Sequence, residues 1–472
     1  MRRARRSGLG LAALALGVVP AAAHAAELDG AALGWFWVVP FAGMLLSIAL
    51  LPLVALRLWH HHYGKIAVAW ALLTVVPLGL LHGPGTAADV ALHTLVGEYV
   101  PFIIFIGALY VVAGGIYISG NLHGTPLLNT AILALGGVLA SFMGTTGAAM
   151  LLIRPLIRAN DNRQRRVHTV VFFIFIVANV GGSLTPLGDP PLFLGFLKGV
   201  SFFWTMSHMF LPMVFGLVVL LLVFFAIDTV LYRRDLADGL QRDPTPDAPL
   251  RIEGGINFVF LALIVVAVLV SGLWKPGIDL ALLGQVVPLE GALRDLSFLL
   301  IAAASLALTA RTTREQNEFG WGPIAEVAKL FFGIFLTMAP VLLMLRAGTA
   351  GAFAPLVQLT TDASGQPVNA MYFWLAGALS SFLDNAPTYL VFFNLAGGDA
   401  QVLMTTLAPT LTAISMGAVF MGANTYIGNA PNFMVKAIAE ERGIAMPSFF
   451  GYMAWSGAIL IPLFVVMTLV FF

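Results

Sequence analysis

The segment Gly182-Ser-Leu-Thr-Pro-Leu-Gly-Asp-Pro-Pro-Leu-Phe193 has a counterpart 240 residues further on, Gly422-Ala-Asn-Thr-Tyr-Ile-Gly-Asn-Ala-Pro-Asn-Phe433. A second pair has the same offset, since Leu139-Ala-Ser-Phe-Met-Gly-Thr-Thr-Gly147 corresponds to Leu379-Ser-Ser-Phe-Leu-Asp-Asn-Ala-Pro387. Each segment interrupts an apolar run with small, polar or proline residues. Interrupted apolar segments at matching positions of two halves are typical of the binding site of a secondary transporter. The repeat therefore predicts a membrane carrier.

The composition indicates a chain that folds in lipid. Hydrophobic residues make up 59% of the sequence and charged residues 10%, against roughly 45–50% and about 25% in soluble domains. So few polar groups are not enough to cover a surface in water, and the expected partner is the lipid bilayer. The net charge of +1 gives no support to nucleic-acid binding, and the absence of cysteine excludes disulfides and thiolate sites. The sequence has no glycine-rich phosphate loop of the kind that ATP-driven transport requires.

The N-terminus has the pattern of a secretory signal peptide. Residues 2–6 contain four arginines, residues 9–19 are apolar, and Ala23-His-Ala25 offers a small-residue cleavage site. We therefore expect residues 1–25 to be a signal peptide. The alternative is an uncleaved first membrane helix, for which the apolar run is short.

Apolar runs long enough to cross about 30 Å of hydrocarbon occur in both halves of the chain. The expected spans are 34–57, 66–82, 99–118, 167–200 and 209–231, followed by 254–274, 292–310, 331–348, 402–436 and 448–472. Two further apolar segments, 127–157 and 371–397, are broken in the middle, and we expect each to form a re-entrant hairpin. The predicted fold class is an all-α polytopic membrane protein with broken helices at the midplane.

The distribution of Lys and Arg is consistent with this layout. Of the 24 basic residues, four lie in the leader and four on the expected outer side, and the other sixteen are assigned to the cytoplasm. The outer four are Lys198, Lys275, Arg294 and Arg346. This bias follows the positive-inside rule and predicts a multi-pass protein of the bacterial inner membrane.

Five crossings separate the two halves, and five is an odd number, so the second half enters the membrane upside down. We therefore predict an inverted repeat of five spans plus one hairpin per half, over residues 26–231 and 254–472. The polar, proline-containing segment 232–253 is the expected cytoplasmic linker.

The broken segments contain groups that can bind a cation. Glycine and proline unwind a helix, which frees carbonyl oxygens and exposes the amide end of a new half-helix. Positions expected to be unwound or to act as hinges are Gly144, Gly147, Gly182, Pro186, Gly188, Pro190, Pro191, Pro387, Gly422, Gly428 and Pro431. Neutral oxygens that suit a hard cation such as sodium are those of Thr145, Thr146, Thr185, Asn385, Asn424, Thr425, Asn429 and Asn432.

Two carboxylates, Asp189 and Asp384, lie in these breaks. A charge at membrane depth is costly, so a functional role is the first interpretation of both. The alternative is that each caps the half-helix that follows it, more readily for Asp189 because Pro190 begins a helix. The halves differ chemically, since Asn429 corresponds to Asp189 and Gly144 corresponds to Asp384. Burial favours the protonated form of a carboxyl group, which can then exchange its proton for a metal cation, as antiport requires.

Anion and transition-metal binding receive less support. No Arg or Lys lies within either break, which argues against direct binding of citrate or succinate, although bound sodium could offset the two carboxylates. The run His60-His61-His62 is expected to be a solvated cluster at a helix end, because ligation needs a geometry that the run alone does not indicate.

The segments Gly182–Pro191 and Asp384–Thr388 resemble the hallmark segments of the ion transporter superfamily, above all those of NhaD-type sodium/proton antiporters and of citrate-transporter-like and arsenite-permease families. The resemblance implies a homodimer in which a transport unit moves against a scaffold in each protomer. It also implies two ion sites, one lined by Thr145, Thr146 and Thr185 and the other lined by Asp384, Asn385, Thr425 and Asn429. Carboxylate-transporting members carry Ser-Asn-Thr at the hairpin tips, where this chain has Gly144-Thr-Thr146 and Asp384-Asn-Ala386. That departure favours exchange of cations and protons.

The sequence therefore predicts a secondary transporter without a cofactor rather than an enzyme. The leading hypothesis is a sodium (or lithium)/proton antiporter in which Asp384 is the principal exchanging group and Asp189 is the second acid. The alternative is a sodium- or proton-coupled citrate or dicarboxylate carrier on the same fold. A distant alternative is an intramembrane aspartyl protease. It rests on Leu187-Gly-Asp189, which matches only part of the Gly-x-Gly-Asp motif of that enzyme because Pro186 takes the place of the first glycine.

Overall fold

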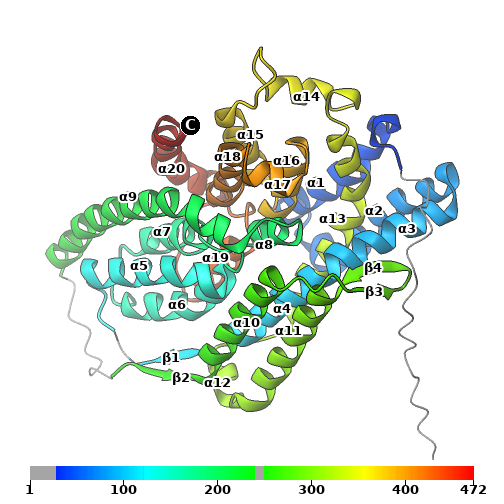
Figure 1. Cartoon of the computed structure of the whole chain (residues 1–472). Helices are drawn as coiled ribbons and strands as arrows, with labels where there is room; N and C mark the ends of the chain where they lie inside the picture. The colour runs from blue at the N-terminus through cyan, green and yellow to red at the C-terminus, as the bar shows by residue number, and fades with distance from the viewer. Residues whose placement is uncertain (1–27, 121, 240–248) are drawn as a thin grey trace, which may run out of the picture.

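The computed structural model describes residues 28–120, 122–239 and 249–472 (Figure 1). The expected signal peptide and residues 240–248 of the expected linker lie outside the described residues. The helices of the first half are α1 (Val38–Val54), α2 (Leu56–His82), α3 (Pro84–Thr94), α4 (Val100–Ala113), α5 (Pro126–Met143), α6 (Thr145–Ala159), α7 (Val167–Ile176), α8 (Pro190–Leu197) and α9 (Phe202–Ala237).

In the described residues the second half repeats the hairpin and the broken span that follows it, although it has eleven helices where the first half has nine. Its helices are α10 (Ile256–Leu273), α11 (Leu289–Leu308), α12 (Arg311–Gln316), α13 (Gly322–Arg346), α14 (Ala354–Leu359), α15 (Asn369–Phe382), α16 (Asn385–Leu395), α17 (Ala400–Met404), α18 (Ala408–Phe420), α19 (Ala430–Glu441) and α20 (Phe449–Phe471). Two short antiparallel pairs join the helices: β1 (Tyr117–Ser119) with β2 (Arg251–Glu253), and β3 (Asp279–Leu282) with β4 (Gln285–Pro288).

Nine helices in the described ranges are long and apolar enough to cross a membrane. Eight of them coincide with expected spans. One of these eight is formed by α3 and α4 in series, and the other seven are α1, α2, α9, α10, α11, α13 and α20. The ninth is α5, the first arm of the expected hairpin. The remaining two expected spans are interrupted by the short 3₁₀ segments η4 (Val180–Ser183) and η6 (Met421–Asn424). The chain is thus an all-α polytopic membrane protein with broken helices, as the sequence predicts.

The third span begins earlier than expected. We predicted residues 99–118, but α3, the π-helical turn η3 (Leu95–Tyr99) and α4 run on without a gap from Pro84 to Ala113. The π-turn ends two residues before Pro101. Proline has no N–H to donate, and the wider turn allows the chain to remain helical there.

The helices form two groups in space (Figure 1). We name α1–α4 with α10–α13 the flanking group, in which α2 packs against α13 and α4 against α11. We name α5–α9 with α15–α20 the hairpin group, whose centre is formed by the almost fully buried α7 and α18. The groups meet where α4 packs on α6 and where α13 packs on α16. These two contacts involve corresponding elements of the two halves.

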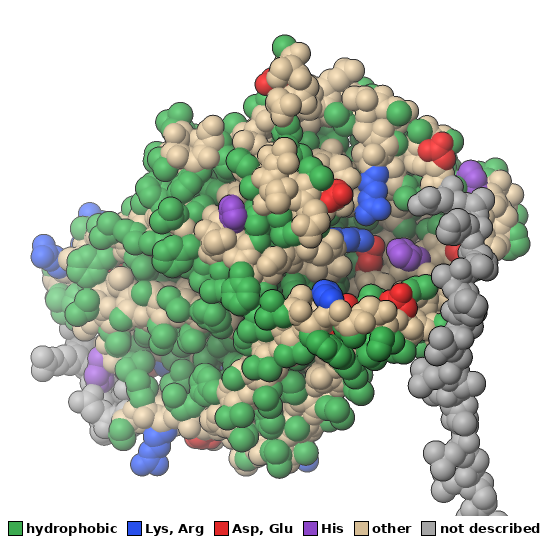
Figure 2. Space-filling view, in the orientation of Figure 1, with side chains coloured by type: hydrophobic (Ala, Val, Ile, Leu, Met, Phe, Trp, Pro, Cys, Tyr) green, Lys and Arg blue, Asp and Glu red, His purple; other side chains and the backbone are tan. Residues whose placement is uncertain are grey.

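The outer surface is apolar over much of the face in Figure 2. Leu80 and Leu469 are each 81% exposed, and Leu222 is 65% exposed. Large apolar side chains exposed on spans of this length are suited to contact with lipid.

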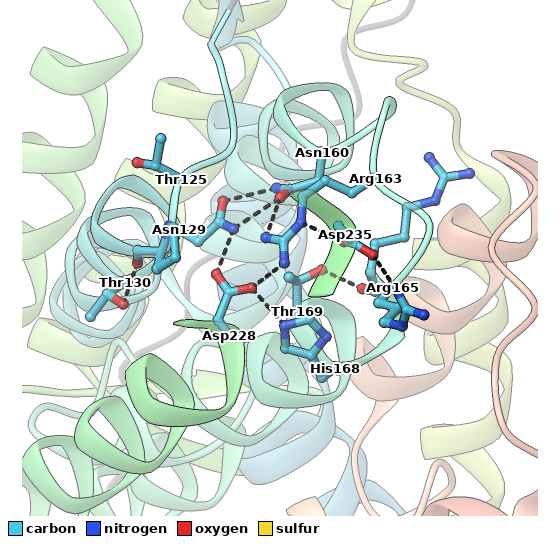
Figure 3. A network of polar contacts seen from close by, with 12 residues as sticks. Thr125, Asn129, Thr130, Asn160, Arg163, Arg165, His168, Thr169, Asp228 and Asp235 are labelled. Carbon is cyan, nitrogen blue, oxygen red and sulfur yellow. Dashed lines mark hydrogen bonds and ion pairs between the residues drawn. The ribbon is translucent and has the colours of Figure 1, made fainter. Parts of the chain in front are cut away.

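The helix α9 continues into the segment 232–253, which we predicted to be a linker, and ends only at Ala237. An ion network without exposure to solvent holds this end (Figure 3). The Nη2 atom of Arg163 lies 2.6 Å from Oδ1 of Asp228, and its Nε lies 3.4 Å from Oδ2 of Asp235. Asp235, within the expected linker, is therefore a buried partner of the α6–α7 connection, as is Asp228 of the expected span before it.

The same network joins the base of the first hairpin to α7 and α9 (Figure 3). Asn129 of α5 and Asn160, at the end of α6, exchange hydrogen bonds of 2.9 and 2.8 Å. Asn129 also donates to Asp228 at 2.9 Å, and His168 of α7 lies 2.8 Å from the same carboxylate. Asp228 thus connects α9 with the hairpin and with α7.

Candidate functional site

The two helix breaks, residues 177–189 (first break) and 421–429 (second break), are held by the same pair of hydroxyl contacts. Thr185 donates to the carbonyl of Ser141, and Thr425 donates to the carbonyl of Ser381 at 2.5 Å. Each threonine oxygen also accepts from the amide two residues later, at 3.1 and 3.2 Å. These contacts satisfy backbone groups that unwinding frees. Both predicted site threonines therefore have a structural role in this conformation.

Glycines allow the backbone to fold tightly within each break. A β-carbon at Gly188 would lie 2.1 Å from the carbonyl oxygen of Gly182, and one at Gly428 would lie 2.5 Å from that of Gly422. No side chain fits at such distances. The predicted hinge glycines therefore meet in pairs, one pair in each break.

Prolines mark the starts of the new helices. Pro190 and Pro191 begin α8, Pro431 is the second residue of α19, and Pro387 lies in the first turn of α16. A proline suits the first turn because the missing N–H would have no partner within the helix. Pro186 lies within the first break itself.

The first hairpin tip contacts the first break directly. Gly144 joins α5 to α6 with a φ of +81°, a conformation that favours glycine. The amide of Thr145 donates to the carbonyl of Gly188 at 2.8 Å. Thr146 is half-buried beside it and makes no hydrogen bond to Asp189. Gly147 is close to α4, since a β-carbon there would lie 2.8 Å from an alanine of that helix.

Asp189 lies where the two halves converge, and it is only 1% exposed. Its Oδ1 accepts hydrogen bonds from Thr145 Oγ1 and Asn429 Nδ2, each at 3.2 Å. Its Oδ2 accepts from Asn385 Nδ2 at 2.5 Å. The side chain makes no capping bond to α8. Predicted site residues from both hairpin tips and both breaks thus meet at one carboxylate.

Asp384 lies in a different environment. Its carboxylate caps α16 by accepting from the amide of Ala386 at 3.0 Å, and it is only half-buried. Its carbonyl accepts from the hydroxyl of Thr388 at 3.0 Å. The sequence made capping the readier alternative for Asp189, but in the structure Asp384 is the capping residue.

Two side-chain amide oxygens of the predicted site accept no hydrogen bond from any described residue. Asn385 Oδ1 and Asn424 Oδ1 are buried, and within the described chain no hydrogen-bond partner reaches either atom. The Nδ2 of Asn424 is used, since it donates to the hydroxyl of Ser381 at 2.9 Å. A buried acceptor without a partner is costly, and a hard cation such as sodium is a partner that amide oxygens suit.

Two further amides, Asn179 and Asn432, join the two breaks. The sequence indicated Asn432 as a neutral oxygen donor, whereas Asn179 was missed. Asn179 donates to Asn432 Oδ1 at 2.8 Å and accepts from Asn429 at 3.4 Å. Asn432 in turn donates to the carbonyls of Gly422 and Thr425, at 2.8 and 2.9 Å. The signal that could have found Asn179 is an amide side chain within an otherwise apolar membrane segment, where polar groups are rare unless they are paired or functional.

The fold and this site define a multi-pass membrane transporter. Residues 30–472 match the family described as "putative citrate transport", and the chain belongs to that family. No curated protein sequence matches the chain. The family membership agrees with the citrate-transporter-like resemblance expected from the hallmark segments.

Proposed function

We propose that the protein exchanges sodium or lithium for protons across the membrane. The observation that carries the proposal is the environment of Asp189. The carboxylate is buried and receives three hydrogen bonds from neutral donors, and no Lys or Arg forms an ion pair with it in the described ranges. A buried carboxylate without a compensating charge costs several kcal/mol. Either a proton or a cation removes that cost, and competition between the two at one group is what antiport requires.

In this proposal Asp189 is the principal exchanging group, whereas the hypothesis from the sequence assigned that role to Asp384. The reassignment rests on the different partners of the two carboxylates. Asp189 is surrounded by side chains from both halves, while Asp384 is occupied as the cap of α16. The partnerless oxygens of Asn385 and Asn424 are additional ligands for the cation, and Asp384 is the second acid.

The test is sodium- or lithium-induced proton movement in everted membrane vesicles. We expect activity in the natural protein, none in Asp189→Asn, and a partial loss in Asp384→Asn. Asp399→Asn is the matched control, because Asp399 caps the short helix α17 away from the breaks. A well-expressed natural protein that moves no protons with either cation would overturn the proposal. Full activity in Asp189→Asn would overturn the role of that residue.

A second candidate is sodium-coupled citrate transport, which the family description favours. Among the described residues, no Lys or Arg pairs with Asp189, so a carboxylate substrate would depend on bound sodium to offset the acidic groups. Uptake of labelled citrate into proteoliposomes, with and without a sodium gradient, separates this candidate from antiport.

We further propose that residues 26–231 and 254–472 are oppositely oriented repeats in a bacterial inner membrane, and that the protein is a homodimer. The distribution of Lys and Arg and the repeated order of elements support the orientation. Reporter fusions at the two ends of α9 test it, and chemical cross-linking in native membranes tests the dimer.

A further inference from the structure

The turn after α12 is fixed to the flanking group by its neighbours. Asn317 donates to the carbonyls of Gly114 and Ile116, at 3.2 and 3.1 Å, just beyond the end of α4. The hydroxyl of Tyr110 donates to the carbonyl of Gly320 at 2.7 Å. The residue between these anchors, Glu318, therefore has a backbone position set by α4.

Glu318 adopts a φ of 54°, and in the described ranges the only other non-glycine residue with positive φ is Leu283. This left-handed conformation is unfavourable for a residue with a β-carbon. Glycine would be the easier residue at the turn, so the presence of a carboxylate suggests that the side chain has a function.

The carboxylate of Glu318 contacts the hairpin group at two points. Its Oε2 lies 2.7 Å from Nη2 of Arg154 on α6, and its Oε1 lies 3.0 Å from Nη2 of Arg442, which follows α19. The two arginines come from opposite halves of the chain. One acid of the flanking group thus holds both halves of the hairpin group.

We propose that Glu318 is an ionic clamp that fixes the hairpin group against the flanking group on one face of the membrane, the face that the Lys and Arg bias assigns to the cytoplasm. Other polar contacts also join the groups, since Arg346 of α13 donates to Asn394 of α16 at 2.5 Å and Lys198 after α8 pairs with Glu98 of η3. Glu318 differs from these because it pairs with both halves of the hairpin group at once. Its two ion pairs have a defined geometry and exist together only in one relative position of the groups. Release of the clamp therefore accompanies any movement of one group past the other.

A cavity on the face opposite to Glu318 can be used to follow the relative position of the hairpin group and the flanking group. It has a volume of about 480 Å³ and is lined by Ser201 and Phe202 of the hairpin group and by Ser271 and Gly291 of the flanking group. Because its walls belong to different groups, its width depends on their relative position. Ser201 is exposed and suits a reporter.

The natural chain contains no cysteine, so Ser201→Cys provides a single labelling site. We would compare the rate at which a membrane-impermeant maleimide labels this cysteine in proteoliposomes, alone and combined with Glu318→Gln, Arg442→Gln or Glu315→Gln. Glu315 is the matched control, because it lies on α12 and pairs only with the exposed Arg311, at 2.8 Å. Loss of partly exposed ion pairs shifts an equilibrium about two- to fivefold.

We expect Glu318→Gln and Arg442→Gln to change the labelling rate in the same direction by about that factor, and Glu315→Gln to leave it unchanged. Equal rates in Glu318→Gln and Glu315→Gln would overturn the clamp, as would opposite changes in the two clamp variants. If Glu318→Gln fails to fold, Arg442→Gln alone tests the clamp. The side chain of Arg442 is 51% exposed, so its replacement is expected to leave folding intact. The readout involves no transported ion, so failure of the antiport proposal would leave this result unaffected.

Discussion

The side-chain amide of Asn385 lies 2.5 Å from the carboxylate of Asp189, so the hairpin tip of the second half contacts the break of the first. Thr145, from the other hairpin tip, donates to the same carboxylate. The resemblance to known transporters implied one ion site for each half. The contacts instead join residues of both halves around one acid, so changes in one half are expected to alter cation binding by the other.

Replacing Asn385 by Ala tests this sharing. The change removes a hydrogen bond to a charged group, which contributes about 1.5–3 kcal/mol, and also removes a buried oxygen available to the cation. We expect the sodium concentration for half-maximal proton movement to rise about tenfold or more. Asn369→Ala is the control. Asn369, the first residue of α15, accepts a 2.8 Å hydrogen bond from Thr410 and does not contact Asp189. An equal effect of the two substitutions would contradict the shared site.

Replacing Gly188 by Ala tests the close backbone contact in the first break. The new β-carbon would lie 2.1 Å from the carbonyl oxygen of Gly182, which is backbone and has no room to move. Overpacking of this kind costs about 1–3 kcal/mol or more, so we expect a lower thermal unfolding midpoint in detergent and loss of transport. Gly457→Ala on α20 is the control, because a β-carbon there meets no atom within 4 Å. Similar midpoints for the two variants would show that the break is looser than described.

The sequence predicted the fold well because hydropathy and the repeat are strong signals in a membrane protein. The broken helices were found from their glycines and prolines, and the polar residues around Asp189 were found from the same segments. The sequence did not indicate that α9 runs past residue 231, because Asp235 looks like a solvated polar residue until its partner Arg163 is located in space. Periodicity carries no information on such long-range pairing.

The roles of Asp189 and Asp384 also depend on contacts between residues far apart in the sequence. Both Asp189 and Asp384 precede a helix, and capping preferences favoured Asp189 as the cap, although the structure has Asp384 in that role. Only the structure brings Asn385 and Asn429 to Asp189. A sign of the fixed backbone was nevertheless present in the sequence, because Ser141 and Ser381 correspond across the repeat. Their hydroxyls donate to the carbonyls of Gly181 and Met421, which also correspond.

The pH dependence of the clamp follows from Glu318. Partial burial would raise its pKa, but the hydrogen bond from Arg154 and the charges of Arg154 and Arg442 outweigh burial and lower the pKa below the usual value of a glutamic acid. A carboxyl with a lowered folded-state pKa contributes stability above its unfolded value of about 4.3, and that contribution is lost as the pH falls through the folded pKa. We expect the labelling difference between Glu318→Gln and the natural residue to be constant from about pH 5 to pH 8 and to shrink below about pH 4. A difference that disappears near pH 6.5 would instead indicate control by a histidine.

Replacing Arg163 by Gln tests the network at the base of the first hairpin. The substitution leaves the carboxylate of Asp228 buried without its cation, which lies at 2.6 Å in the natural protein. Breaking a buried pair in this way costs about 3–5 kcal/mol, so we expect a marked fall in the thermal unfolding midpoint. Arg311→Gln is the matched control, because Arg311 is 92% exposed and surface pairs contribute only about 0–1 kcal/mol. Adding Asp228→Asn to Arg163→Gln should restore part of the lost stability, since the uncompensated charge is then removed. If the double variant is no more stable than the single one, the loss comes from packing of the arginine rather than from the charge of Asp228.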